Sequence, residues 1–175
     1  MTAGLTIRGL AVVFVAALFQ AGLFASLAVV GGTPDLLLLA VVSLGLLRGS
    51  VPGAVFGFAG GLVLDLLTLE TLGVTSLVLT LVGFWAGRYA ETTGYRRRLA
   101  PLFAVGALTV LAAVFGFALH YMLGEEVVAR HALVTFLAPA LLLNLALALP
   151  VHALVCAAAG GRRRRDPTAE VELVV

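Results

Sequence analysis

Cysteine is almost absent from this chain of 175 residues, which contains one, Cys156, inside an apolar run. A single cysteine excludes a disulfide framework within the chain and the paired CxxC spacing of redox and zinc sites. Catalytic signatures are absent too, because no nucleophile–base pair, P-loop or dinucleotide fingerprint occurs. We therefore expect Cys156 to be a small buried side chain and the protein not to be an enzyme.

Charged residues are also scarce, at 11% of the chain, whereas hydrophobic residues make up 62% and the mean hydropathy is +1.15. Soluble domains contain about 45–50% apolar and about 25% charged residues, so this chain lies far outside their range. A water-soluble fold could not cover so much apolar surface, and lipid must be its solvent. The net charge of +2 therefore does not indicate a nucleic-acid partner.

Six apolar stretches separated by polar residues predict an all-α membrane protein that forms a single integral domain over residues 1–175. A helix needs roughly 20 apolar residues to cross the hydrocarbon core. The second stretch has only about 13, or about 20 Å of helix, so it borrows flanking residues or lies in a locally thin or protein-lined site. The predicted helices cover about residues 10–30, 35–47, 51–69, 72–90, 99–123 and 131–158.

Basic residues are distributed unevenly between the two sides of the predicted helices. With the N-terminus in the cytoplasm, the outer segments keep only Arg130, and the inner segments hold the other ten of the 11 basic residues. Arginine resists transfer across a membrane, so this bias predicts a compact bundle of six transmembrane helices with both termini cytoplasmic. Residues 162–175 are expected to form a short cytoplasmic tail, first basic and then acidic. The inner basic residues are Arg8, Arg48, Arg88, Arg96, Arg97, Arg98 and Arg162 to Arg165.

Glycine recurs every fourth residue in the third predicted helix, at Gly53, Gly57 and Gly61, and at the same spacing in the fourth, at Gly83 and Gly87. In lipid, helices associate through close packing and shared polar contacts, and small residues let two backbones approach. The stripe therefore has two interpretations: packing between the protein's own helices, or a docking groove for a partner's membrane helix. The two are compatible if they use different faces.

Two carboxylates lie within or beside the apolar helices. Asp65 continues the glycine stripe near the outer end of the third helix, where an unpaired charge is costly. It either accepts hydrogen bonds from backbone groups of the turn at residues 68–75 or anchors another helix or a ligand. Asp35 follows Thr33 and Pro34 at the start of the second helix, a position that the helix macrodipole favours for an acid.

The remaining polar residues indicate helix packing more than chemistry. Asn144, in the middle of the sixth helix, is expected to hydrogen-bond to a neighbouring helix, and Pro139 and Pro150 on either side of it can kink that helix. His120 lies near the acidic residues of the following loop, but the spacing matches no metal-ligand motif, so no metal or cofactor is predicted. The arginine runs suit anionic lipid headgroups, although anchoring of the topology explains them equally well.

In residues 34–88, short polar segments alternate with apolar helices in a definite order. The segment reads PDLLLLAVVSLGLLRGSVPGAVFGFAGGLVLDLLTLETLGVTSLVLTLVGFWAGR. The order is Pro-Asp, an apolar helix, Arg-Gly, GFxxGLxxDLL, Leu-Gly and a helix that ends in GxxxGR. This pattern, which covers about a third of the chain, resembles the bacterial rod shape-determining protein family MreD. The positions that match the motif are Pro34, Asp35, Arg48, Gly57, Gly61, Asp65, Gly73, Gly83, Gly87 and Arg88.

The resemblance implies a non-enzymatic component of the cell-elongation machinery in the bacterial cytoplasmic membrane. The MreD family is linked to the bitopic partner MreC, and with it to MreB and to the peptidoglycan synthase pair of RodA and its penicillin-binding protein. The resemblance also implies an architecture similar to the substrate-binding subunits of energy-coupling-factor vitamin transporters. The residues expected to serve partner binding or helix packing are Asp35, Arg48, Gly53, Gly57, Gly61, Asp65, Gly83, Gly87 and Arg88.

A second function stays open, that of a solute-binding subunit of such a vitamin transporter. It requires a polar pocket that opens to the outside, and its candidate residues are Asp35, Asp65, Glu70, His120 and Asn144. The chain has one Trp and three Tyr with which to stack a vitamin ring. This scarcity favours the assembly protein over the solute-binding subunit.

Overall fold

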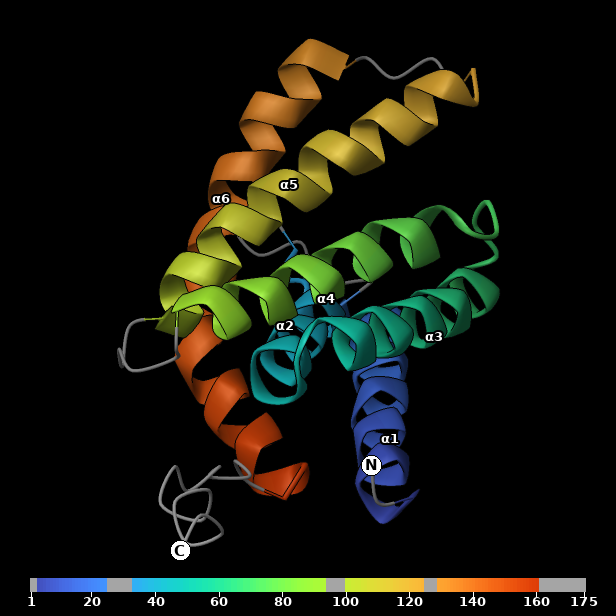
Figure 1. The fold of residues 1–175 in the computed structure, drawn as a ribbon. Helices are drawn as coiled ribbons and strands as arrows, with labels where there is room; N and C mark the ends of the chain where they lie inside the picture. The colour runs from blue at the N-terminus through green and yellow to red at the C-terminus, as the bar shows by residue number, and fades with distance from the viewer. Residues whose placement is uncertain (1–2, 25–32, 94–99, 125–128, 161–175) are drawn as a thin grey trace, which may run out of the picture.

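A computed structural model describes residues 3–24, 33–93, 100–124 and 129–160 of the chain. The regular elements in these ranges are all helices, and they form one bundle (Figure 1). They are α1 (Ala3–Phe19), a π-helical turn (Gln20–Phe24) that continues α1, α2 (Leu36–Arg48), α3 (Ser50–Thr68), α4 (Val74–Thr93), α5 (Ala100–Met122) and α6 (Ala129–Ala158).

The apolar character of these helices agrees with the predicted all-α membrane protein. In the part of the chain that the structure describes, four helical segments are long and apolar enough to cross a membrane, while α2 is apolar but shorter. The four segments are Gly4–Gly22, Ser50–Thr68, Ala100–Met122 and Leu137–Ala158.

The first helix differs most from its predicted range, because α1 begins at Ala3 rather than near residue 10. An apolar run marks the part of a helix that lipid surrounds, whereas the hydrogen-bonded backbone of α1 continues past Arg8 to the polar end. The end of the predicted range, near residue 30, lies outside the described residues. The predicted tail at 162–175 and the arginines at 96–98 also lie outside them.

Helix α2 lies in the middle of the bundle (Figure 1) and is buried on every side. Every residue from Leu37 to Leu46 is buried, and α2 packs against each of the other α-helices. A helix that is hydrophobic all round is stable only when protein or lipid surrounds it completely. The short second helix therefore lies in a protein-lined site, which is one of the possibilities stated above.

The glycine stripe brings α3 and α4 into backbone contact. A Cβ atom on Gly57 would lie less than 3.0 Å from the carbonyl oxygen of Leu79, and one on Gly53 would lie equally close to that of Gly83. Cβ atoms essentially never lie so close to a backbone atom in real structures. The face of α3 that carries Gly53, Gly57 and Gly61 is thus occupied by α4, and Gly83 reaches back to the same face.

Three arginines gather at one end of the bundle, which we call the arginine end and define by Arg8, Arg48 and Arg88. Arg48 hydrogen-bonds to the carbonyl of Leu5 near the start of α1 and to the carbonyl of Ala159 just after α6. The first and last described helices therefore have their outer termini on the same side of the bundle. The turn between α3 and α4 and the last residues of α5 lie at the opposite end (Figure 1).

The backbone contact between α3 and α4 predicts that Gly57→Ala destabilises the protein. The added methyl group would press on the Leu79 carbonyl, and overpacking of this kind costs roughly 1–3 kcal/mol. Gly106→Ala is a matched control, because its Cβ atom would meet only a Leu145 side-chain carbon at 3.6 Å, an ordinary contact. Unfolding in detergent measures both variants. Equal stability of the two would contradict the packing described here.

Candidate functional site

The start of α2 is stabilised by its own N-cap residue, Asp35. The carboxylate accepts a hydrogen bond from the backbone N–H of Leu38 at 2.9 Å. The first turn of a helix leaves backbone N–H groups without intrahelical acceptors, and an acid there also suits the positive end of the macrodipole. Asp35 thus occupies the helix-start position on α2, directly after Pro34.

Two amide side chains from other helices satisfy further backbone groups at this end of α2. The N–H of Asp35 donates to Oδ1 of Asn144 in α6 at 2.8 Å, and the N–H of Leu36 donates to Oε1 of Gln20 at 2.8 Å. Gln20 lies in the π-helical turn after α1 and also donates from Nε2 to the Pro34 carbonyl at 3.3 Å. The start of α2 is therefore held by residues from both ends of the sequence.

Asn144 also links α6 to α5. Its Nδ2 donates to the hydroxyl of Thr109 at 3.3 Å, and only 1% of the residue is exposed. One amide thus pairs with groups on two neighbouring helices, which is a common way for membrane helices to associate. The chain contains a single Asn and a single Gln, and both are used at the start of α2.

Arg48, the last residue of α2, connects the opposite end of this helix to three others. Its Nη1 donates to the carbonyl oxygen of Leu5 in α1, and its Nη2 donates to that of Ala159 after α6 at 3.0 Å. The guanidinium carbon lies 5.7 Å from the ring centroid of Phe56 in α3, within the range of a cation–π contact. The last carbonyl oxygens of a helix lack intrahelical donors, and Arg48 supplies one to Ala159 just after α6 while it also ties the start of α1 to the same place through Leu5.

The junction between α2 and α3 depends on Glu91 of α4. Gly49 has a φ of 97°, which side-chain-bearing residues rarely adopt, and it lets the chain turn directly from one helix into the next. The carboxylate of Glu91 then accepts hydrogen bonds from the N–H of Ser50 at 2.8 Å and from its hydroxyl at 3.0 Å. Arg88 pairs with Glu91 at 3.6 Å, but both side chains are largely exposed. A solvent-exposed pair of this kind contributes little stability.

Asp65 holds α3 to α4 by hydrogen bonds at the end of the bundle opposite the arginines. It is 1% exposed, and its Oδ2 accepts hydrogen bonds from the N–H of Gly73 at 2.8 Å and from that of Ser76 at 3.4 Å. Of its two expected roles, the hydrogen bonds to the turn are present in the structure. The other carboxyl oxygen and the Ser76 hydroxyl are buried without a hydrogen-bond partner among the described residues.

The predicted site residues thus belong to three separate sets of polar contacts between helices, which we call the fastenings, and they do not form one pocket. Asp35 belongs to the start of α2, Arg48 and Arg88 to the arginine end, and Asp65 to the α3–α4 turn. Within the described residues, no group of three or more His, Cys, Asp or Glu side chains is placed to hold a metal ion. Cys156 is half-buried in α6, where its Sγ lies 3.4 Å from Nε2 of His152.

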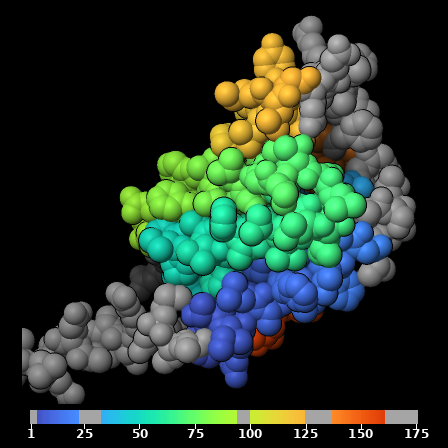
Figure 2. All heavy atoms as spheres, turned by 90° about the vertical axis from the view of Figure 1, so that its right-hand side faces the viewer, coloured from blue at the N-terminus to red at the C-terminus, as the bar shows by residue number. Residues whose placement is uncertain are grey.

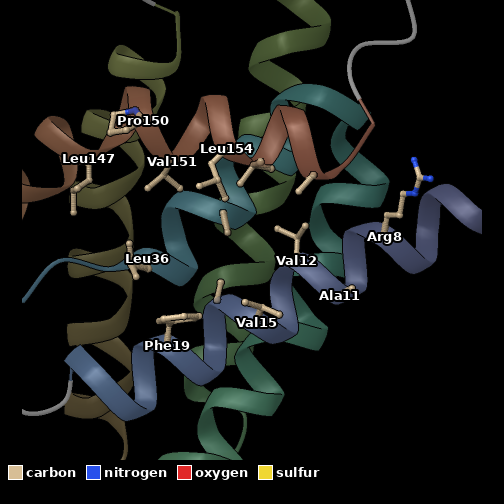
Figure 3. A pocket seen from close by; sticks show the side chains of 14 residues that line it. Arg8, Ala11, Val12, Val15, Phe19, Leu36, Leu147, Pro150, Val151 and Leu154 are labelled. Atoms are coloured by element: carbon tan, nitrogen blue, oxygen red, sulfur yellow. The ribbon is translucent and has the colours of Figure 1, made fainter.

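A cavity of about 540 Å³ opens between α1 and α6 (Figure 3). Aliphatic and aromatic side chains from both helices line it, and Leu36 and Ala40 of α2 contribute to the same lining. Arg8 is the one charged residue among those that line it. None of the other polar residues described above faces this cavity.

These features define a multi-pass membrane protein whose buried polar side chains satisfy the ends of its helices. Residues 4–157 match the protein-family model described as rod shape-determining protein MreD. Comparisons with curated proteins and with solved structures find no match. The chain therefore belongs to the MreD family of rod-shape-determining membrane components, which is not known as a family of enzymes. The match confirms the resemblance seen in residues 34–88 and extends it over nearly the whole chain.

Two residues of the fastenings were not anticipated from the sequence, Gln20 and Glu91. Gln20 is the only glutamine in the chain and interrupts an apolar run, which is the signal that could have identified it. Glu91 follows Arg88 by three positions, and this spacing suggests an ion pair along one helix. Its more important contact with Ser50 joins residues that are distant in the sequence, and no local pattern indicates it.

The contacts of Arg48 predict that Arg48→Gln lowers stability, whereas Arg88→Gln leaves it nearly unchanged. A glutamine cannot reach both carbonyls, and lost hydrogen bonds to a charged group cost roughly 1.5–3 kcal/mol. Arg88 is the matched control, because it lies at the same end and pairs only with exposed Glu91. Thermal unfolding in detergent compares the two variants. A larger loss for Arg88→Gln would show that these roles are reversed.

The capping of α2 predicts that Asn144→Leu is more damaging than Thr109→Val. The first change leaves the partly buried N–H of Asp35 without its acceptor, which costs about 1 kcal/mol or more. The second removes only the longer 3.3 Å hydrogen bond and keeps the side-chain shape. Unfolding by denaturant in mixed micelles measures both. If Thr109→Val proves the more destabilising, the asparagine acts mainly through α5 and not through α2.

Proposed function

We propose that this protein is a non-enzymatic component of the bacterial cell-elongation machinery that binds an MreC-type bitopic partner and helps to organise peptidoglycan synthesis. The observation that carries the proposal is the family match over residues 4–157. We place the protein in the cytoplasmic membrane with the arginine end inside. The grouping of Arg8, Arg48 and Arg88 at one end supports this orientation, because cytoplasmic segments retain basic residues.

The use of the buried polar groups supports a scaffold rather than a solute carrier. Asp35 and Asn144 lie close together, as a ligand site would require. Their side chains, however, form hydrogen bonds with the first turn of α2 and with Thr109. Asp65 is occupied by the α3–α4 turn. The cavity between α1 and α6 is apolar apart from Arg8. No described feature favours a vitamin-binding subunit, so the proposed activity is binding of another protein.

The partner's contact surface must lie away from the glycine stripe, because α4 covers that face of α3. The end opposite the arginines offers a different surface, in which large apolar side chains extend beyond the helices. Leu69 is 90% exposed and has a left-handed φ of 55°, which leucine rarely adopts, while Leu72 of the same turn is 61% exposed. Tyr121 and Met122 at the end of α5 are exposed as well.

We call these four residues the outer apolar surface: Leu69, Leu72, Tyr121 and Met122. Figure 2 looks onto this end of the molecule, where the last turns of α5 lie above α4 and α3 in the view. Apolar groups exposed past the ends of membrane helices would meet water or headgroups, and such patches mark interaction sites. A bitopic partner with a membrane helix and an outer domain presents a segment at this depth. Through that partner we expect the protein to influence MreB and the RodA synthase pair.

The proposal predicts that Leu69→Ser combined with Leu72→Ser weakens capture of the partner. Loss of two apolar anchors at a protein interface reduces affinity by at least about fivefold. Val51→Ser is the matched control, because Val51 is 68% exposed and lies in the first turn of α3 at the arginine end. Co-purification of the partner from membranes that express each variant, together with rescue of rod shape, provides the measurement.

The outcomes separate the surface from the function. Undiminished capture by the Leu69/Leu72 variant excludes the outer apolar surface as the contact. Failure of the unmodified protein to capture any MreC-type partner, under conditions that preserve other membrane complexes, excludes the proposed binding itself.

A further inference from the structure

The groove between α1 and α6 is open along the side of the bundle because these two helices hardly touch (Figure 3). Val15 and Phe19 of α1 face Val151 and Leu154 of α6 across it. These walls are exposed, at 49% for Val15, 50% for Phe19 and 69% for Leu154. Because the protein is a membrane protein, this surface is in contact with lipid or with another membrane component.

The end of the groove carries positive charge that the described residues do not neutralise. Arg8 is exposed and makes no ion pair within the described part of the chain. Its guanidinium lies at the end of α6, where a Cβ atom on Gly160 would be 3.2 Å from Nη1. Arg48 nearby donates to carbonyl oxygens and not to a carboxylate. Beyond Gly160 the sequence continues into four arginines, Arg162 to Arg165, which lie outside the described residues.

We propose that this groove binds one anionic phospholipid, with its acyl chains between α1 and α6 and its phosphate beside Arg8. The groove matches the two parts of such a molecule, because an apolar channel ends at an unneutralised guanidinium. Arginine binds phosphate oxygens through a fork of N–H donors. The lipid would fill the space between α1 and α6 where these two helices do not contact each other.

The charge at the end of the groove favours a lipid over a partner's helix. The lining is apolar apart from Arg8, so a matching occupant has an apolar body and an anionic group beside that guanidinium. Flexible acyl chains can follow its irregular walls. A partner's helix also offers no anionic group for Arg8 unless its sequence places an acid at that depth.

The test measures retention of phosphatidylglycerol and phosphatidylcholine by the purified full-length protein, using native mass spectrometry and thermal unfolding in detergent. We expect phosphatidylglycerol to be retained more strongly and to raise the unfolding temperature more than phosphatidylcholine. Arg8→Gln should weaken phosphatidylglycerol retention about fivefold, the typical effect of one basic residue near an anionic lipid. Arg88→Gln is the control for net charge at the same end and should leave retention unchanged.

A second pair of variants tests the apolar part of the site. Ala11→Trp fills the groove from α1 and should reduce retention of both lipids, whereas Val51→Trp on the exposed face of α3 should reduce neither. If Ala11→Trp impairs folding, Leu154→Trp fills the same groove from α6.

Three results would overturn the proposal. In the first, Arg8→Gln and Arg88→Gln weaken phosphatidylglycerol retention equally, so that only net charge matters. In the second, retention is unaffected by both groove-filling variants. In the third, a photocrosslinker at Val15 in native membranes captures a protein instead of a lipid, so that a partner's helix covers the groove. Selective loss with Arg8→Gln and with a groove-filling variant supports the lipid site.

Discussion

The structure depends on satisfying the two ends of a short helix that lies entirely inside a membrane protein. Helix α2 is buried from Leu37 to Leu46 and partly buried at both ends, so water has little access to its terminal N–H and C=O groups. Each unpaired backbone group in such surroundings costs several kcal/mol, and the protein must supply the partners itself. Asn144 and Gln20 do so at the first turn of α2, and the N–H of Gly49 pairs with the Gly45 carbonyl at its last turn. Arg48 at that end joins α2 to the start of α1 and to the end of α6. These contacts determine where the surrounding helices are positioned.

The same requirement explains why so few polar residues remain for chemistry or for solute binding. In a chain with 11% charged residues, nearly every buried polar side chain that the structure describes has a structural partner. The glycine stripe likewise serves the close contact between α3 and α4. The described polar residues leave two exposed features, apolar side chains at one end and an apolar groove with Arg8 along one side. The proposed binding of a partner protein and of a lipid uses these two features.

Much of this architecture could be predicted from the sequence, and the reason is the solvent. Lipid demands long apolar helices and retains arginine on one side, so the helices and the gathering of Arg8, Arg48 and Arg88 follow from composition and order. The glycine spacing indicated a close helix contact, and the motif in residues 34–88 indicated the family that the match over residues 4–157 then established. The individual polar contacts could not be predicted from the sequence. Asn144 accepts a hydrogen bond from Asp35, 109 positions away, and no local sequence pattern indicates this contact.

Hydrogen exchange at the first turn of α2 tests the central claim most directly. In the protein embedded in lipid nanodiscs, the amides of Asp35, Leu36 and Leu38 should exchange as slowly as those in the middle of α2, because each donates to a side-chain acceptor. The first turn of α5, at Leu102 and Phe103, provides the comparison. If the three α2 amides exchange as fast as these two, α2 is not held by the contacts described here and the account fails.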